Sequence, residues 1–223
     1  LQKTARLSRE EFDGKVKKNK TSTIPPTIPK HLQPGPVMPG ARGQAATHPY
    51  ECMTVTCLCP YFKKTFVSTT LIKGHIGSNN QCVLENGRPL TMAYRKEFRM
   101  MSDDERNRYH RAMTELKSSG EYDRLTVEHF RVGTASGAHA GPGFLPWHRE
   151  FLKRVEIALR LVDPTVAIPY WDMVLDNYLD DPRDSILFSP LFVGENDALG
   201  NVVTGPYGYW STTEGGNAIK RCN

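Results

Sequence analysis

The sequence predicts a mainly α-helical domain with long irregular loops, preceded by a proline-rich arm. Apolar side chains recur at helical spacing in three stretches, and Gly, Pro and Asp are frequent in much of the rest. No internal repeat is visible. We therefore expect three parts: a basic, proline-rich arm or linker at 1–50, a cysteine-bearing segment at 51–90, and a helical domain at 91–223.

Start and stop signals bound the predicted helices. Ser102 and Glu105 have the spacing of a capping box, and Gly120 ends the first helix. The second helix covers about 121–130. Pro146 suits the first turn of the third helix, where a proline costs no hydrogen bond.

Helical periodicity fades after Asp163–Pro164, where the third helix is expected to end. Thr165–Ile168 is predicted to be a brief β-like run. Residues 176–223 are rich in Gly, Pro and Asp with little periodicity, so long irregular loops are expected there.

The net charge of +5 belongs to the arm. Residues 1–50 contain nine Lys or Arg and three acidic residues, a local net charge of +6, which leaves −1 for 51–223. A nucleic-acid-binding domain needs positive charge on its folded surface, so no nucleic-acid partner is expected. The chain has no run of about 18 apolar residues, so no membrane association is expected either.

Five cysteines indicate disulfides and therefore an oxidising, extracellular compartment. Cys57 and Cys59 would point to the same side of a strand, so each is expected to pair with Cys52 or Cys82, in a connectivity left open. A zinc knuckle is a weaker alternative, because the spacing lacks paired C-x2-C ligands. Cys222 is left over, and we expect its partner to lie outside this chain.

Three histidines occupy positions from which they could meet. His129 lies on the apolar stripe of the second helix, His139 in a glycine-rich loop and His148 on the stripe of the third helix. Two antiparallel helices with a short loop would bring them to one inward-facing point, and neutral imidazoles suit copper or zinc. Taken singly, His129 also fits a hydrogen-bonded core position and His139 an ordinary loop position. An unpaired imidazole is costly in the apolar setting of His148.

These histidines lie in motifs that resemble the first-copper half of tyrosinases and molluscan-type haemocyanins. The motifs are Gly-Ala-His139, Phe-Leu-Pro-Trp-His148-Arg-Glu-Phe-Leu and Ile-Pro-Tyr-Trp171-Asp172. Residues 122–129 are similar to the helix with that family's first histidine, and 205–210 are similar to a segment of invertebrate members. The resemblance covers about 90–220 and implies half of a type 3 copper helical bundle, in which antiparallel helices carry the histidines.

The resemblance also implies residue roles. His129, His139 and His148 would be the ligands of the copper called A. Packing and hydrogen-bonding support around the ligands would come from Trp147, Arg149, Glu156, Trp171 and Asp172. For Glu156, a surface salt bridge is the alternative.

Three features depart from the family pattern. Only nine residues separate His129 from His139, fewer than in many relatives, and His110 is the substitute ligand. Gly137 stands where some relatives have a cysteine that forms a thioether, so that crosslink is absent. No histidine follows His148, so this chain supplies ligands for one copper, whereas the complete site holds two.

The function that the resemblance implies is a secreted, tyrosinase-like copper monooxygenase or catechol oxidase, which oxidises phenols with O2 to o-quinones. Its second-copper (CuB) half is expected as a C-terminal partner outside this chain, because the sequence starts without Met and stops at Asn223. Alternatives are a haemocyanin-like oxygen carrier and a non-enzymatic copper-binding or structural domain. A three-histidine zinc hydrolase is disfavoured, since neither Glu150 nor Glu156 is clearly placed as a general base.

Overall fold

The structure is a computed structural model that describes residues 46–62, 74–133, 138–139 and 141–221. The chain divides into two units, Leu1–Ala45 and Ala46–Asn223. The first unit lies outside the described residues, and so do Gly137 and Cys222. The predictions for most of the arm, for the missing thioether and for the partner of Cys222 therefore stay predictions.

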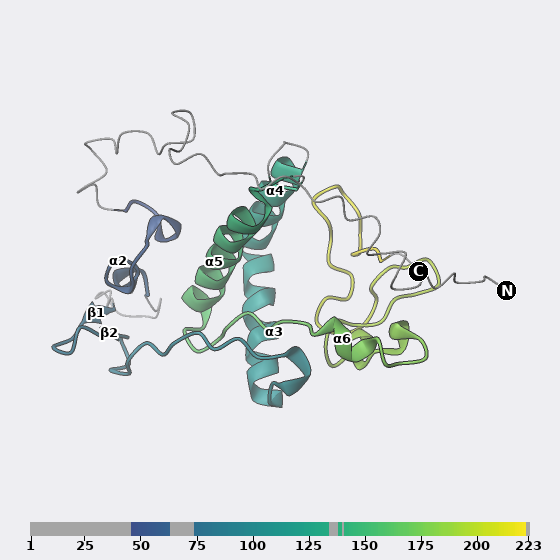
Figure 1. Ribbon diagram of the computed structural model, residues 1–223, viewed down its shortest axis with the longest axis horizontal. Coiled ribbons are helices and arrows are strands. Elements are labelled where there is room, and N and C mark those ends of the chain that lie inside the picture. Colours follow the sequence, from purple (N-terminus) through teal and green to yellow (C-terminus); the bar gives the residue numbers. More distant parts are fainter. Residues whose placement is uncertain (1–45, 63–73, 134–137, 140, 222–223) are drawn as a thin grey trace, which may run out of the picture. The chain divides into compact units, whose positions relative to one another are not determined.

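Three long helices form the centre of the second unit, as the predicted helical class requires (Figure 1). They are α3 (Asp103–Ser118), α4 (Glu121–Gly133) and α5 (Phe144–Val162), and each contacts the other two. Shorter helical turns are η2 (Pro49–Glu51), α2 (Val55–Leu58), η3 (Cys59–Tyr61), η4 (Phe98–Met100), α6 (Met173–Asp176), η5 (Pro182–Asp184) and η6 (Ile186–Phe188). Within the described ranges, no helix has the length and apolarity to cross a membrane.

Helix α3 begins and ends as its sequence predicts. The Ser102 hydroxyl accepts from the Glu105 N–H at 3.3 Å, and the Glu105 carboxylate accepts from the Ser102 N–H at 2.9 Å. Lys96 also donates to Glu105, and these hydrogen bonds lower the pKa of Glu105 to about 2. Gly120 follows with φ of 79°, a left-handed conformation that glycine adopts without a Cβ clash.

The other two helices are slightly longer than predicted. Helix α4 continues to Gly133, where Arg131 in the last turn complements the negative end of the helix dipole. Helix α5 begins at Phe144, which makes Pro146 its third residue. Pro146 therefore still lies in the first turn, where backbone N–H groups have no acceptor within the helix.

The cysteine-bearing segment contains two disulfides, Cys52–Cys57 and Cys59–Cys82. The expectation that Cys57 and Cys59 lie on a strand was wrong. The Thr54 hydroxyl accepts from the Cys57 N–H at 3.3 Å and starts the helical turn α2, and η3 follows directly. With their sulfurs paired, these four cysteines do not form a zinc knuckle.

Two short antiparallel strands complete the cysteine-bearing segment. Strand β1 (His75–Ile76) pairs with β2 (Cys82–Val83), with Ile76 opposite Cys82. Asn80 in the connecting turn has φ of 57°, a conformation that asparagine tolerates better than most residues.

The β-like run expected at Thr165–Ile168 is not a strand, because its backbone N–H groups donate hydrogen bonds to groups outside a sheet. The Val166 N–H donates to the Asp163 carbonyl at 3.1 Å, and the Ile168 N–H donates to the Glu156 carboxylate at 3.2 Å. A parallel bridge forms further on, between Glu97 and Tyr170.

The main core fills the space between the three long helices. Its buried side chains include Leu116 from α3, Leu125 from α4 and Leu159 from α5. Tyr50 from η2 joins the same cluster and donates a hydrogen bond to Glu121, which ties the cysteine-bearing segment to the start of α4. The helices that carry His129 and His148 are therefore held by one continuous apolar core.

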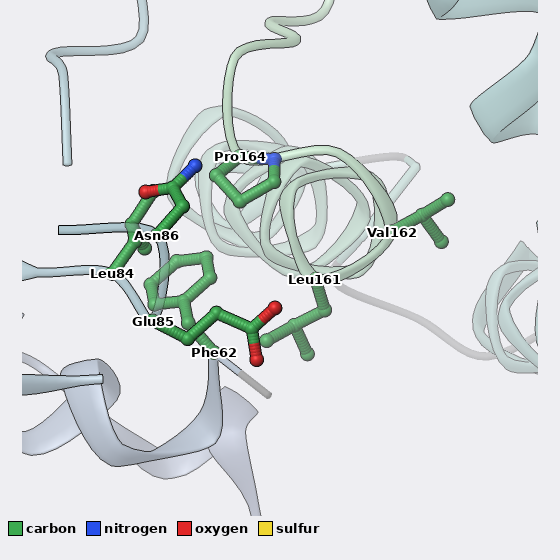
Figure 2. Close-up of a pocket in the computed structure, with 7 residues that line it drawn as sticks. All are labelled: Phe62, Leu84, Glu85, Asn86, Leu161, Val162 and Pro164. Atoms are coloured by element: carbon green, nitrogen blue, oxygen red, sulfur yellow. The ribbon is translucent and has the colours of Figure 1, made fainter. Parts of the chain in front are cut away.

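A pocket of about 140 Å³ lies between the cysteine-bearing segment and the end of α5 (Figure 2). Phe62, Leu84 and Leu161 form its apolar wall, and Glu85 and Pro164 also line it. The histidines of interest do not line this pocket.

We expect Leu159→Ala to lower the free energy of unfolding by about 2–5 kcal/mol, because it removes a fully buried side chain and leaves a cavity. Urea unfolding followed by circular dichroism measures the change. Leu199→Ala, at a position 73% exposed, is the control and should change stability by no more than about 0.5 kcal/mol. Equal losses for both variants would contradict the described core.

Candidate metal centre

The structure brings the three predicted histidines together at one point. The Nε2 atom of His129 lies 3.3 Å from Nε2 of His148 and 3.3 Å from Nε2 of His139. One ligand nitrogen from each histidine lies within 4.8 Å of the other two. The cluster joins α4, the following loop and α5, as expected for two helices with a short connection.

His148 is oriented by its own helix. Its Nδ1 lies 2.8 Å from the Phe144 carbonyl oxygen, one turn earlier in α5. A carbonyl can only accept, so Nδ1 carries the proton and Nε2 keeps its lone pair. A hydrogen bond on one ring nitrogen that points the other nitrogen at the metal is the usual arrangement of a metal-binding histidine.

His129 lies against a pair of stacked rings. The Trp147 and Phe151 ring centroids are 5.2 Å apart and nearly parallel, and the His129 ring is 5.7 Å from Trp147 and 5.3 Å from Phe151. Next to His129, the Glu128 carboxylate accepts from Arg154 of α5 at 2.9 Å. Helix α4 is thus fixed to α5 by ring packing and by an ion pair, which sets the position of His129.

His139 approaches the cluster from the loop between the two helices. The preceding Ala138 is buried, which anchors the loop, while His139 itself is exposed. The Phe144 ring lies 6.4 Å from the His139 ring and 4.3 Å from the His148 ring. The cluster is therefore covered by apolar rings on the helix side and open on the side of His139.

The donor set fits a copper or zinc ion. Two metal–nitrogen bonds of about 2.0–2.1 Å at a tetrahedral angle separate the nitrogens by roughly 3.3–3.4 Å, which matches the two shorter separations. In the described part of the chain no carboxylate joins the cluster, so hard cations that prefer oxygen are disfavoured.

Electrostatics also favour a bound cation at this point. Burial lowers the pKa of His129, and the neighbouring His139 and His148 lower it further. The imidazole is then neutral near pH 7, as metal binding requires.

Of the residues predicted to support the ligands, one contacts the histidine rings and others lie away from them. Trp147 contacts the rings of both His129 and His148. Arg149 is exposed and makes no hydrogen bond or ion pair to any described residue. Glu156 forms the salt bridge of the alternative, with Arg95 at 2.8 Å, and also accepts from the Ile168 N–H at 3.2 Å. It fixes the segment after α5, two turns away from His148.

Trp171 and Asp172 belong to a separate polar network. Trp171 donates to Asp176, and the Asp172 side chain accepts from the Val174 N–H at the start of α6. Arg99 donates to Asp176 at 2.6 Å and to the Asp172 carbonyl at 2.9 Å. In the described residues these contacts do not reach the histidine cluster, so a contribution of Trp171 and Asp172 to the metal centre stays a prediction.

His110, the substitute ligand, lies elsewhere. It is buried on α3, with Nδ1 at 3.1 Å from the Tyr207 hydroxyl and Nε2 at 3.4 Å from the Leu191 carbonyl. Its two nitrogens are engaged in hydrogen bonds, and it is not part of the three-histidine group.

Some supporting groups were not predicted from the sequence. The contact between the Phe144 carbonyl and His148 could have been predicted, since residues four apart in a helix share a face. The Glu128–Arg154 pair joins two helices, and its partners are 26 residues apart in sequence. No local pattern indicates which of several charged residues on α4 and α5 will meet.

Comparison with known proteins gives a consistent result. Residues 117–222 match the family described as the common central domain of tyrosinase. A tyrosinase-like protein of Caenorhabditis elegans, tyr-3, is 46% identical over 82% of this chain and 25% of its own length. A tyrosinase of Streptomyces glaucescens is 37% identical over 52% of this chain and 44% of its own length.

Molluscan proteins match as well. Tyrosinase-like protein 2 of Margaritifera margaritifera is 35% identical over 54% of this chain and 27% of its own length. The chain spans between a quarter and less than half of the length of these three relatives.

We expect His139→Ala to lower the copper affinity of the chain by more than about 100-fold, because loss of a ligand should exceed the 10–100-fold cost of losing an outer contact. Copper content after dialysis, measured by mass spectrometry of the metal, provides the readout. The exposed His75 on β1 offers a matched control, and His75→Ala should leave the copper content unchanged. If His139→Ala also leaves it unchanged, the site assignment is wrong.

Stability should fall in acid partly because of His110. Burial lowers the pKa of His110 from 6.5, a hydrogen bond to the Leu191 carbonyl opposes this, and Arg106 lowers the pKa further. The unfolded chain then binds a proton more readily, so the free energy of unfolding decreases as the pH falls through 6.5 toward the folded-state pKa. We expect a smaller decrease in His110→Asn than in the parent chain, measured by urea unfolding at about pH 7 and pH 5.

The control for this pH experiment is His75→Asn, which removes an exposed histidine and should keep the parental decrease. A decrease in His110→Asn as large as that of the parent would contradict the assignment to His110.

Proposed function

Because residues 117–222 belong to the tyrosinase family, we propose that this chain is the first-copper part of a phenol oxidase that converts phenols and catechols to o-quinones with O2. The observation that carries this proposal is the convergence of three imidazole nitrogens, at separations that suit one copper ion. Relatives named tyrosinase and grixazone synthase further support an oxidase.

In this proposal the protein holds the metal and shapes the approach to it. His129, His139 and His148 would hold one copper through Nε2, and the Phe144 carbonyl keeps the Nδ1 proton of His148 in place. When bound, paired coppers supply the oxygen chemistry of the reaction. The Trp147–Phe151 stack covers His129 with apolar rings on the helix side of the cluster.

The open side of the cluster is where a phenol would approach. His139 is exposed there, and the Phe144 ring is 44% exposed beside it. Aromatic rings favour edge-to-face or offset contacts with one another, so Phe144 offers a surface that orients a phenol ring toward the metal.

The second copper site is proposed to lie on a C-terminal (CuB) half outside this chain, since no histidine follows His148. Large apolar side chains remain exposed on the two helices that carry His129 and His148, namely Phe130 of α4 and Phe144, Leu145 and Leu152 of α5. An exposed apolar patch next to an open metal site fits a protein interface. The relatives, which are more than twice as long as the matched region, have room for such a half.

We also propose that the protein acts outside the cell. Two disulfides in the described residues need an oxidising compartment to form and persist. In that setting Cys222 could hold the second half covalently, and the intact mass of the purified parent protein with and without reductant would reveal such a bond.

The decisive experiment compares this chain alone with the parent protein that includes the CuB half. We expect two copper ions and catechol-dependent O2 uptake in the parent protein, and at most one copper and no such uptake in residues 1–223. His139→Ala should abolish the uptake by the parent protein, while His75→Ala should retain it. Equal uptake by the short chain would refute the need for a second half.

A further inference from the structure

A buried hydrogen-bonded pair, Tyr207 and His110, has no part in the proposed metal chemistry. Tyr207 is buried, and its hydroxyl lies 3.1 Å from Nδ1 of His110, which is also buried. On the other side of the imidazole, Nε2 faces the Leu191 carbonyl at 3.4 Å. The carbonyl can only accept, so Nε2 carries the proton, Nδ1 is the acceptor and the Tyr207 hydroxyl donates to it.

A path of aromatic rings leads from Tyr207 toward the surface. The Trp210 ring contacts Tyr207 edge-on at 5.0 Å and Tyr122 of α4 at 5.2 Å. Trp210 and Tyr122 are partly exposed, whereas Tyr207 is not. Tryptophan and tyrosine are the side chains that lose one electron most readily without a metal, so the contacts form a continuous route for an electron to leave Tyr207.

We propose that Tyr207 and His110 form a proton-coupled redox site, which gives up one electron through Trp210 to a strong one-electron oxidant. In this step the Tyr207 O–H bond breaks and an N–H bond forms at Nδ1 of His110. Tyr207 becomes a neutral phenoxyl radical, His110 becomes an imidazolium, and the oxidant gains the electron. No further reactant is needed for the balance.

A positive charge disfavours Trp210 and Tyr122 as the places where the oxidation ends. The Lys117 ammonium lies 5.9 Å from the Trp210 ring and 5.7 Å from the Tyr122 ring. Its positive charge opposes a radical cation on either ring. Oxidation of Tyr207 leaves its ring neutral because the proton moves to His110, and the positive charge then lies on the His110 imidazolium, which burial and Arg106 disfavour.

The place of this route in the fold indicates a use. Tyr122 precedes His129 by seven residues on α4, which is about 10 Å along the helix axis. In the proposed oxidase, an oxidising equivalent that left the histidine cluster along α4 would meet Tyr122 and, through it, the route to Tyr207. This use rests on the proposed function, whereas the redox site itself does not.

Photo-oxidation of the full chain tests the site independently of phenol oxidation. A flash-generated ruthenium(III) polypyridyl complex, with persulfate as the electron acceptor, serves as the one-electron oxidant. Transient absorption follows the near-ultraviolet band of phenoxyl radicals and the visible band of tryptophan radicals. Exposed tyrosyl radicals decay by pairing between molecules, so we expect a separate, long-lived phenoxyl signal from buried Tyr207.

The variants assign that signal to residues. Tyr207→Phe removes only the hydroxyl and should abolish the long-lived signal, whereas Tyr178→Phe, at a position 83% exposed, should keep it. Trp210→Phe should slow the appearance of the signal, and the exposed Trp171→Phe should not. A signal that persists in Tyr207→Phe, or that forms at the same rate in Trp210→Phe, would overturn the proposal.

His110 is tested by its effect on lifetime. His110→Phe removes the proton acceptor and should abolish the long-lived signal, with folding checked by circular dichroism. If that variant does not fold, the Tyr207→Phe and Trp210→Phe results still decide the proposal.

Discussion

The contact between α4 and α5 is the constraint on which the three-histidine cluster depends. His129 belongs to one helix and His148 to the other, and their nitrogens meet only while the helices keep their spacing. Two interactions of different kinds maintain it: the Glu128–Arg154 ion pair and the packing of His129 on Trp147 and Phe151. The ion pair is partly exposed, so it contributes little to stability. The ring packing and the shared apolar core therefore supply most of the free energy that holds the imidazoles together.

A second framework organises the irregular segments that follow α5. Asp176 is buried and accepts hydrogen bonds from Trp171, Ser185 and Arg99. Burial opposes ionisation of Asp176, but the two hydrogen bonds from Trp171 and Ser185 and the charge of Arg99 lower its pKa below the ordinary value. Breaking one of these contacts would leave a buried charge short of partners, which is costly. Polar contacts thus replace regular secondary structure as the ordering element there.

The helices and the meeting of the histidines could be predicted from the sequence because the information is local. The capping box of α3, the glycine after it and the spacing of His129, His139 and His148 all act within about two dozen residues. Pairs such as Arg95–Glu156, which are 61 residues apart, could not be predicted, since many charged residues offer alternative partners. The strand expected at Cys57 and Cys59 failed because the Thr54 cap outweighs a two-residue alternation.

The three histidines of the cluster are close together in sequence. His139 follows His129 by 10 residues, and His148 follows it by 19. Closing so short a loop costs little chain entropy, and contacts between sequence neighbours form early in folding. The three imidazoles can therefore meet as soon as α4 and α5 have packed together, without a contact from residues that are distant in sequence.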